Sequence, residues 1–214
     1  MPSASRKSFE DHLLKDVKQL RVRHREAHPG PGRPSSDLTR SGVFLLCAAW
    51  ELYVEEVILE ACAHVAAKTS SPDQLPLSVK IALAKAAKGD QHDFGVFRLA
   101  GEGWRSYMQA LAQADVGALN TPKAQNLIPL FERYVGVDTK AFFELRKERI
   151  SEFVSKRGDI AHRGAKAGHV SINDLDADYE YMCTLVRELD TFLIEPIKEI
   201  TGTRPWNNRA KGKD

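Results

Sequence analysis

The chain has only three cysteines, and their spacing fits neither a disulfide nor a metal site. Cys47, Cys62 and Cys183 are an odd number without metal-ligand spacing. Cys47 and Cys62 fall on one expected helix, where they lie roughly 22 Å apart along the axis, far beyond disulfide reach. We therefore expect buried thiols in a reducing compartment, with neither a disulfide framework nor a zinc site.

Long hydrophobic runs are also missing. The longest, Val43–Trp50, is far shorter than the ~20 residues that cross a membrane, and Glu51, Glu55 and Glu56 follow it closely. The start of the chain carries charge without an apolar run behind it, so we expect no secretory signal. These absences predict a soluble, cytoplasmic protein with no membrane partner.

Strand-like alternation, internal repeats and a phosphate loop are absent too. Gly101-Glu102-Gly103 lacks the lysine and the preceding strand of a nucleotide-binding loop. His64, His92 and His169 have no partner at ligand spacing. We therefore expect no cofactor and no metal ion.

Helical periodicity dominates what remains. Apolar residues recur every three or four positions along most of the chain, which is typical of helices that bury one face. Thr121-Pro122 supplies an N-cap and a first-turn proline, and Asn173 supplies a cap near the end. The expected helices cover residues 5–27, 38–68, 78–88, 104–114, 121–136, 139–156 and a last segment from Asn173.

These helices predict an all-α, single-domain bundle of about four to six helices. The helix at 38–68 is apolar on nearly every side in its first half, so it is expected to be the buried centre. The domain spans 1–204, with an N-terminal helix at 5–27, a core at 38–200 and an irregular insertion around 90–120. Residues 205–214 are polar and basic, and we expect a disordered tail. We assign the large aromatic side chains to the core rather than to RNA stacking: Trp50, Tyr53, Trp104 and Tyr107.

Charge is balanced overall but unevenly distributed. The net charge is +2, residues 140–166 carry eight Lys/Arg against four Asp/Glu, and residues 171–200 carry eight acids against two bases. The acids Asp174, Asp176 and Asp178 suit the positive N-terminus of the last helix. A basic stretch beside an acidic helix fits a polyanion groove, although charge alone favours the simpler explanation of solvated helix faces.

One segment carries chemistry. Residues 156–164 read Lys-Arg-Gly-Asp-Ile-Ala-His-Arg-Gly, which places an arginine, a carboxylate and a histidine within six residues. Histidine moves protons and arginine holds phosphate oxygens, so the segment suits metal-free RNA cleavage; the alternative is a polar turn between two helices. Arg157 and His162 differ by roughly 140° around a regular helix. Either the helix is distorted at Gly158, or the two side chains converge on RNA from different protomers.

The segment resembles the Arg-x4–6-His motif of the HEPN superfamily, with four intervening residues. Two further segments are similar to its RiboL-PSP-like branch: Trp50–Glu56 resembles a buried helix with an acidic residue, and Asn126–Val137 resembles the segment before the motif. The resemblance covers most of residues 38–200. One departure is that members often carry a polar residue, commonly asparagine, directly after the arginine, whereas this chain has Gly158 followed by Asp159.

The resemblance implies an all-α, metal-independent endoribonuclease that acts as a homodimer with a composite site at its two-fold axis. His162 would take the proton from the ribose 2′-OH, and the partner's His162 would protonate the leaving 5′-oxygen. Arg157 would stabilise the phosphoryl transition state, and the products would be a 2′,3′-cyclic phosphate and a 5′-OH end. DNA lacks the 2′-OH and would be spared.

The remaining candidates each have two explanations. Asp159 either orients His162 or caps a helix end. Lys156 and Arg163 either contact RNA phosphates or are surface charge. Glu51 and Glu55 either reach the motif from the facing helix or are solvated acids.

Three functions follow from this sequence. The first is a ribonuclease toxin or antiviral-defence effector, with RNA as substrate and an antitoxin or regulatory partner. The second is a non-catalytic HEPN-fold module for RNA binding, protein interaction or dimerisation, which Gly158 at the helper position favours. The third is a helical adaptor in which Arg157–Gly164 is a capped turn between helices.

Overall fold

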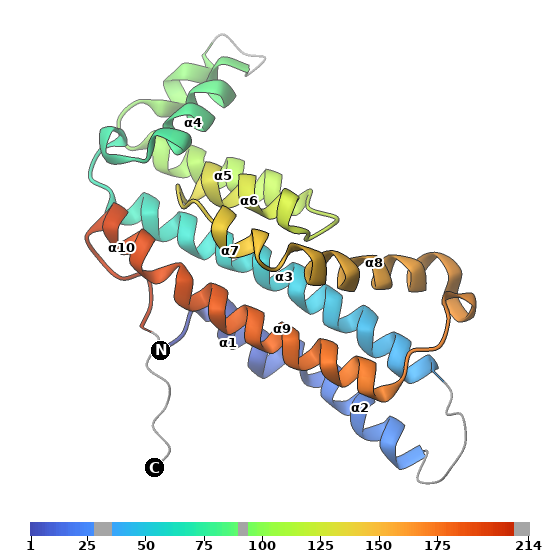
Figure 1. Ribbon diagram of the computed structural model, residues 1–214. Coiled ribbons are helices and arrows are strands. Elements are labelled where there is room, and N and C mark those ends of the chain that lie inside the picture. Colours follow the sequence, from blue (N-terminus) through green and yellow to red (C-terminus); the bar gives the residue numbers. More distant parts are fainter. Residues whose placement is uncertain (28–35, 90–93, 208–214) are drawn as a thin grey trace.

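The protein is a bundle of helices. The computed structural model describes residues 1–27, 36–89 and 94–207, and this part of the chain contains no β-strand (Figure 1). In chain order the helices are α1 (Ala4–Ser8), α2 (Lys15–Ala27), α3 (Asp37–Lys68), α4 (Leu77–Gly89), α5 (Gly103–Gly117), α6 (Ala124–Tyr134), α7 (Lys140–Glu144), α8 (Lys147–Arg163), α9 (Ile172–Phe192) and α10 (Ile194–Thr201). The predicted all-α fold is confirmed.

Helix α3 is the axis of the bundle, as the sequence predicts. It is 32 residues long, or about 48 Å at the helical rise, and it packs against α1, α2, α5, α6, α8, α9 and α10. Trp50 and Tyr53 lie at its middle and are fully buried. The Trp50 Nε1 donates a 3.0 Å hydrogen bond to the Pro122 carbonyl, and the Tyr53 hydroxyl donates one of 3.2 Å to the Val186 carbonyl.

One stripe of α3 is not buried. Phe44 and Leu45 are each 37% exposed and Leu52 is 38% exposed, and the three lie at helical spacing. The expectation that the first half of this helix is buried all round is therefore wrong for this stripe. The stripe matters because its Phe44 contacts Arg157 of α8, which carries the Arg–His motif.

The N-terminal segment departs from a single helix over 5–27. A π-helical segment, η1 (Phe9–Leu13), separates α1 from α2. The Ser3 hydroxyl donates a hydrogen bond to the carboxylate of Asp190 in α9, and the backbone N–H groups of Ala4 and Ser5 donate to the Glu60 carboxylate in α3. One buried hydrogen bond and two that are more exposed therefore tie the start of the chain to two helices of the core.

The end of the described chain is also tied down. Trp206 is 7% exposed and its Nε1 donates a 2.9 Å hydrogen bond to the Asp190 carbonyl. The Asn207 N–H donates to the Met1 carbonyl at 2.9 Å. The expected tail from residue 205 is therefore wrong for residues 205–207, and residues 208–214 lie outside the described part of the chain.

The segment after α4 contains more helix than expected. The 3-10 segment η3 (Gly95–Leu99) and helix α5 pack with α4 at one end of α3 (Figure 1). Trp104 and Tyr107 of α5 are buried in the core, as predicted. Residues 90–93 of the expected insertion lie outside the described chain. The expected helix start at Thr121-Pro122 is wrong, because α6 begins at Ala124 with Lys123 in the N-cap position.

The helix predicted over 139–156 is two helices, α7 and α8. Arg146 stands between them, and its guanidinium turns back to the Phe142 carbonyl and to the Glu188 carboxylate of α9. The last long helix, α9, is capped by Ser171 and not by Asn173. The Ser171 hydroxyl accepts from the Asp174 N–H, while the Asp174 carboxylate accepts from the Ser171 N–H. This reciprocal pair is a capping box.

Candidate functional site

The Arg–His motif lies in the last turns of α8. Helix α8 continues without interruption from Lys147 through Gly158 to Arg163, and Gly164 ends it with a φ of 52°. A Cβ added at Gly158 would meet no atom within 4 Å. The helix is therefore not distorted at Gly158, and the segment is not a turn between helices, so the basis for the adaptor hypothesis is wrong.

Arg157 points toward α3, where an aromatic ring and a carboxylate hold its guanidinium. The guanidinium carbon lies 5.1 Å from the centroid of the Phe44 ring, and Nη2 lies 3.9 Å from Oε2 of Glu51. The side chain is 32% exposed, while its Nε is buried and has no hydrogen-bond partner within the described chain. A positioned guanidinium on a partly exposed side chain is suited to bind an anion such as a phosphate.

Glu51 and Glu55, which could either reach the motif from α3 or be solvated acids, behave differently. Glu51 does reach Arg157, as stated above, and burial raises the pKa of the Glu51 carboxyl while the Arg157 charge partly offsets the increase. Glu55 lies one turn further along α3, and it makes no ion pair or hydrogen bond with any residue that the structure describes. Burial raises the pKa of Glu55, and the negative charges of Glu51 and Glu56 raise it further.

His162 lies on a different side of α8 from Arg157. The helix is regular between them, so the two side chains are about 140° apart around its axis. The His162 side chain is exposed. Its imidazole makes no hydrogen bond or ion pair with the described residues and is free to meet a ligand or a second chain. One protomer therefore does not present both side chains to the same point.

Asp159 performs neither of the two roles expected for it within this chain. It lies one turn inside α8, so it does not cap the helix end. Its carboxylate is exposed and lies 3.8 Å from the Nε of Arg163, which occupies the next turn. No contact joins it to His162 in the described chain. Arg163 is 67% exposed in its side chain and keeps most of its surface available to an anion.

Lys156 is held by a carboxylate that sequence reasoning assigned to a different role. Its Nζ lies 2.7 Å from Oδ2 of Asp178, and Nη2 of Arg149 lies 2.6 Å from Oδ1 of the same group. Asp178 is completely buried, whereas its position in the sequence suggests only an acid that suits the positive N-terminus of α9. Lys156 therefore anchors α8 to α9. The sequence signal for Asp178 was only that it stands in the core-facing spacing of α9, close to Leu175 and Tyr179.

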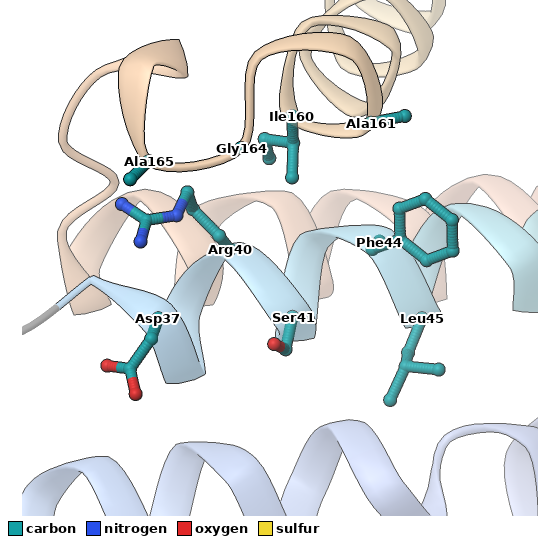
Figure 2. A pocket seen from close by; sticks show the side chains of 9 residues that line it. All are labelled: Asp37, Arg40, Ser41, Phe44, Leu45, Ile160, Ala161, Gly164 and Ala165. Atoms are coloured by element: carbon teal, nitrogen blue, oxygen red, sulfur yellow. The ribbon is translucent and has the colours of Figure 1, made fainter.

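An open pocket adjoins the motif (Figure 2). It has a volume of about 530 Å³ and lies between the N-terminal half of α3 and the end of α8. Phe44, which contacts Arg157, lines it together with Ile160 and Ala161 of the motif itself. Sequence reasoning missed Phe44 because it treated the whole apolar run as core. The spacing of Phe44, Leu45 and Leu52 was the available signal.

Nucleophilic chemistry by a cysteine beside the motif is disfavoured. Cys47 is buried one turn from Glu51, and burial raises the pKa of its thiol to about 12, with Arg157 opposing the increase. A thiol of this kind is almost entirely protonated at neutral pH and is a weak nucleophile. All three cysteines are free and buried, as predicted.

Within residues 1–27, 36–89 and 94–207, no group of three or more His, Cys, Asp or Glu side chains is arranged to hold a metal ion. Over the same ranges, no helix is both long and apolar enough to span a membrane.

Comparison with known proteins finds one family. The sequence profile described as RiboL-PSP-HEPN matches residues 11–195, which is most of the chain. No curated protein and no solved structure matches.

Proposed function

The chain belongs to the RiboL-PSP-HEPN family, and from this membership and the motif geometry we propose that it is a metal-independent endoribonuclease acting as a homodimer. HEPN domains typically bind RNA and act as dimers. The observation that carries the proposal is the state of Arg157. Its side chain is partly exposed, its guanidinium is positioned by Phe44 and Glu51, and Phe44 lines an open pocket.

In the proposed reaction, His162 of one protomer removes the proton from a ribose 2′-OH. The 2′-oxygen attacks the adjacent phosphorus, the bond to the 5′-oxygen breaks, and His162 of the partner subunit donates a proton to that oxygen. Arg157 donates hydrogen bonds to the phosphate oxygens, whose charge increases in the transition state. The products are a 2′,3′-cyclic phosphate and a 5′-OH, and no net proton is consumed.

The second protomer is required by geometry in this proposal. The two side chains diverge by about 140° on an undistorted helix, and His162 is exposed on the side away from the Arg157 contact with α3. A second copy whose α8 lies near the first would bring the missing histidine to the phosphate. We further propose a role as a toxin or antiviral-defence effector that is controlled by an antitoxin or regulatory partner, because an RNase that needs no cofactor is active wherever it meets RNA.

A non-catalytic RNA-binding or dimerisation role is the second candidate, and one observation favours it. The position after Arg157 is Gly158, and the neighbouring Asp159 is paired with Arg163 and does not replace a polar helper. A site without that helper would still hold a phosphate through Arg157.

Cleavage of RNA in the presence of EDTA tests the proposal. We expect the wild-type protein to release fragments ending in 2′,3′-cyclic phosphate, identified by mass spectrometry, and His162→Ala and Arg157→Ala to release none. His169→Ala is the matched control, because His169 is also exposed and lies just beyond the motif. If the wild-type protein binds RNA but leaves it intact, the non-catalytic role replaces the ribonuclease.

Mixing the wild type with an excess of the His162→Ala protein tests the composite site. A heterodimer of the two retains both arginines but only one histidine, so it lacks either the proton acceptor or the proton donor. We expect the excess variant to suppress RNA cleavage by the wild type. Cleavage that stays proportional to the amount of wild-type protein, although sedimentation shows that heterodimers form, would contradict the shared site.

A further inference from the structure

The pocket beside the motif has the size and lining of a small-molecule site. Its volume is about 530 Å³, within the range of about 300–1,000 Å³ that is usual for ligand pockets. Its floor is α3, and Ile160 and Ala161 of α8 form one wall (Figure 2). The lining is mainly apolar, with Asp37, Arg40 and Ser41 as its polar groups. A few polar groups in an apolar hollow is the composition that orients a flat, partly polar ligand.

Phe44 connects this pocket to the motif. Its ring lines the pocket and also lies 5.1 Å from the guanidinium carbon of Arg157. The ring is more than a third exposed, so part of its surface is available for stacking. A phosphate held by Arg157 and a flat ring stacked on Phe44 would therefore be adjacent parts of one ligand. Nucleotides have this arrangement, and stacking on aromatic side chains is how proteins commonly hold unpaired RNA bases.

The charges around the pocket favour a nucleotide over a second apolar surface. Arg40 extends along the α8 side of the pocket and approaches Ala165, while Asp37 and Ser41 point away from α8 (Figure 2). The Arg40 Nη1 donates to the Ser36 hydroxyl, which fixes the direction of its guanidinium. Arg157 contacts the Phe44 ring of this lining, with the Glu51 carboxylate 3.9 Å from its Nη2. An apolar helix docked here would take the Arg40 and Arg157 guanidinium groups out of water, which is unfavourable, whereas a phosphodiester chain supplies a further anion.

We propose that this pocket binds the nucleobase of the RNA nucleotide whose phosphate contacts Arg157, with the base stacked on Phe44 between α3 and the Ile160–Ala161 wall. This inference rests on the proposed function, which supplies RNA as the substrate. It adds to that function a site that selects one base. Because one base lies in the pocket next to the phosphate, the affinity for RNA and the rate of cleavage depend on the identity of that base.

Binding of the four ribonucleoside 3′-monophosphates to the full-length protein tests the pocket, measured by isothermal titration calorimetry. We expect one base to bind best. Phe44→Ala should weaken its binding by about tenfold, because stacking on an aromatic ring contributes on this scale. Ala161→Trp should abolish binding by filling the hollow. Inorganic phosphate has no ring to stack, so Phe44→Ala should weaken its binding less than it weakens nucleotide binding, and Arg157→Ala should weaken the binding of both.

Leu77→Ala is the control variant, since Leu77 is 70% exposed on α4 and remote from the pocket. Its nucleotide affinity should equal that of the wild type. Circular dichroism checks folding, and Phe44→Ala is expected to fold because the ring is partly exposed.

The outcomes separate this proposal from the ribonuclease itself, because the monophosphates are bound and not cleaved. Base-selective binding that Phe44→Ala weakens supports the pocket even if RNA stays intact. Equal binding by the wild type, Phe44→Ala and Ala161→Trp, with an unchanged base preference in RNA cleavage, overturns the pocket and leaves the ribonuclease standing. A shift from dimer to monomer in both variants, with nucleotide binding unchanged, also overturns it and assigns the pocket to the contact between copies.

Discussion

Replacing Asp178 by alanine should loosen the attachment of the motif helix to the core. Asp178 is completely buried and accepts from Arg149 at 2.6 Å and from Lys156 at 2.7 Å. Both donors are on α8, and Lys156 directly precedes Arg157. The variant removes the acceptor of two charge-assisted hydrogen bonds that join α9 to α8.

The magnitude follows from the geometry of these bonds. A hydrogen bond to a charged group contributes about 1.5–3 kcal/mol. The Arg149 and Lys156 side chains are 36% and 31% exposed, so water replaces part of what they lose. Allowing for this rehydration, the free energy of unfolding should fall by about 2 kcal/mol for the two bonds together. In a domain of this size that corresponds to a melting temperature lower by about 4–8 °C.

Asp176 provides the matched control on the same helix. It also pairs with two arginines, Arg21 and Arg25, but its side chain is 27% exposed. Exposed pairs contribute about 0.2–1 kcal/mol each, so Asp176→Ala should lower the melting temperature less than Asp178→Ala. Thermal unfolding followed by circular dichroism measures both. Equal shifts in the two variants would refute the argument that burial makes the Asp178 contacts strong.

Three further predictions concern stability. Glu55→Gln should stabilise the protein at pH 7, because burial raises the Glu55 pKa and folding therefore disfavours its charge. The gain should vanish below about pH 4.3, where the carboxyl is protonated in both the folded and the unfolded state. Urea unfolding midpoints measured at the two pH values check this. Gly158→Ala should raise the free energy of unfolding by about 0.5–1 kcal/mol, since the position is helical and open; a lower urea midpoint would contradict it. Truncation after Arg204 removes the buried Trp206 and should lower the free energy of unfolding by about 3 kcal/mol, whereas truncation after Asn207 should leave the melting temperature unchanged.

The sequence predicted the fold class and the central helix because these depend on local periodicity. It failed where a tertiary contact ends or extends a helix. Leu145 continues the apolar spacing of the expected 139–156 helix, yet it is 85% exposed, and the chain bends there as Arg146 turns back to α7 and α9. The expected helix end at residue 156 is also wrong, because α8 continues through Gly158 to Arg163, and Asp178 anchors Lys156 two residues before Gly158.

Within the site, the sequence identified the residues that bear chemistry but not what positions them. Arg157 and His162 stand out by spacing, and of the two explanations open for Glu51 the structure shows the one in which it reaches Arg157. Asp178 could not be recognised, because an acid near a helix N-terminus has a sufficient local explanation in the helix dipole. Its partners are 22 and 29 residues away in the chain, so only the packing of α8 against α9 reveals them.

Contacts within the described chain hold Arg157 in place, whereas none of the hydrogen bonds or ion pairs there holds His162. In the proposed mechanism, cleavage therefore depends on a second molecule. Arg157 is packed against Phe44 and Glu51, so its direction is set before RNA arrives. His162 is exposed and makes no hydrogen bond or ion pair with the described residues that would fix its rotamer, while proton transfer needs donor and acceptor within about 2.6–3.2 Å. RNA or a second protomer must therefore order the imidazole. Since a regular α8 cannot turn both side chains to one phosphate, association supplies the missing histidine and its orientation together. A partner that covers the exposed face of α8 would then block cleavage without touching Arg157.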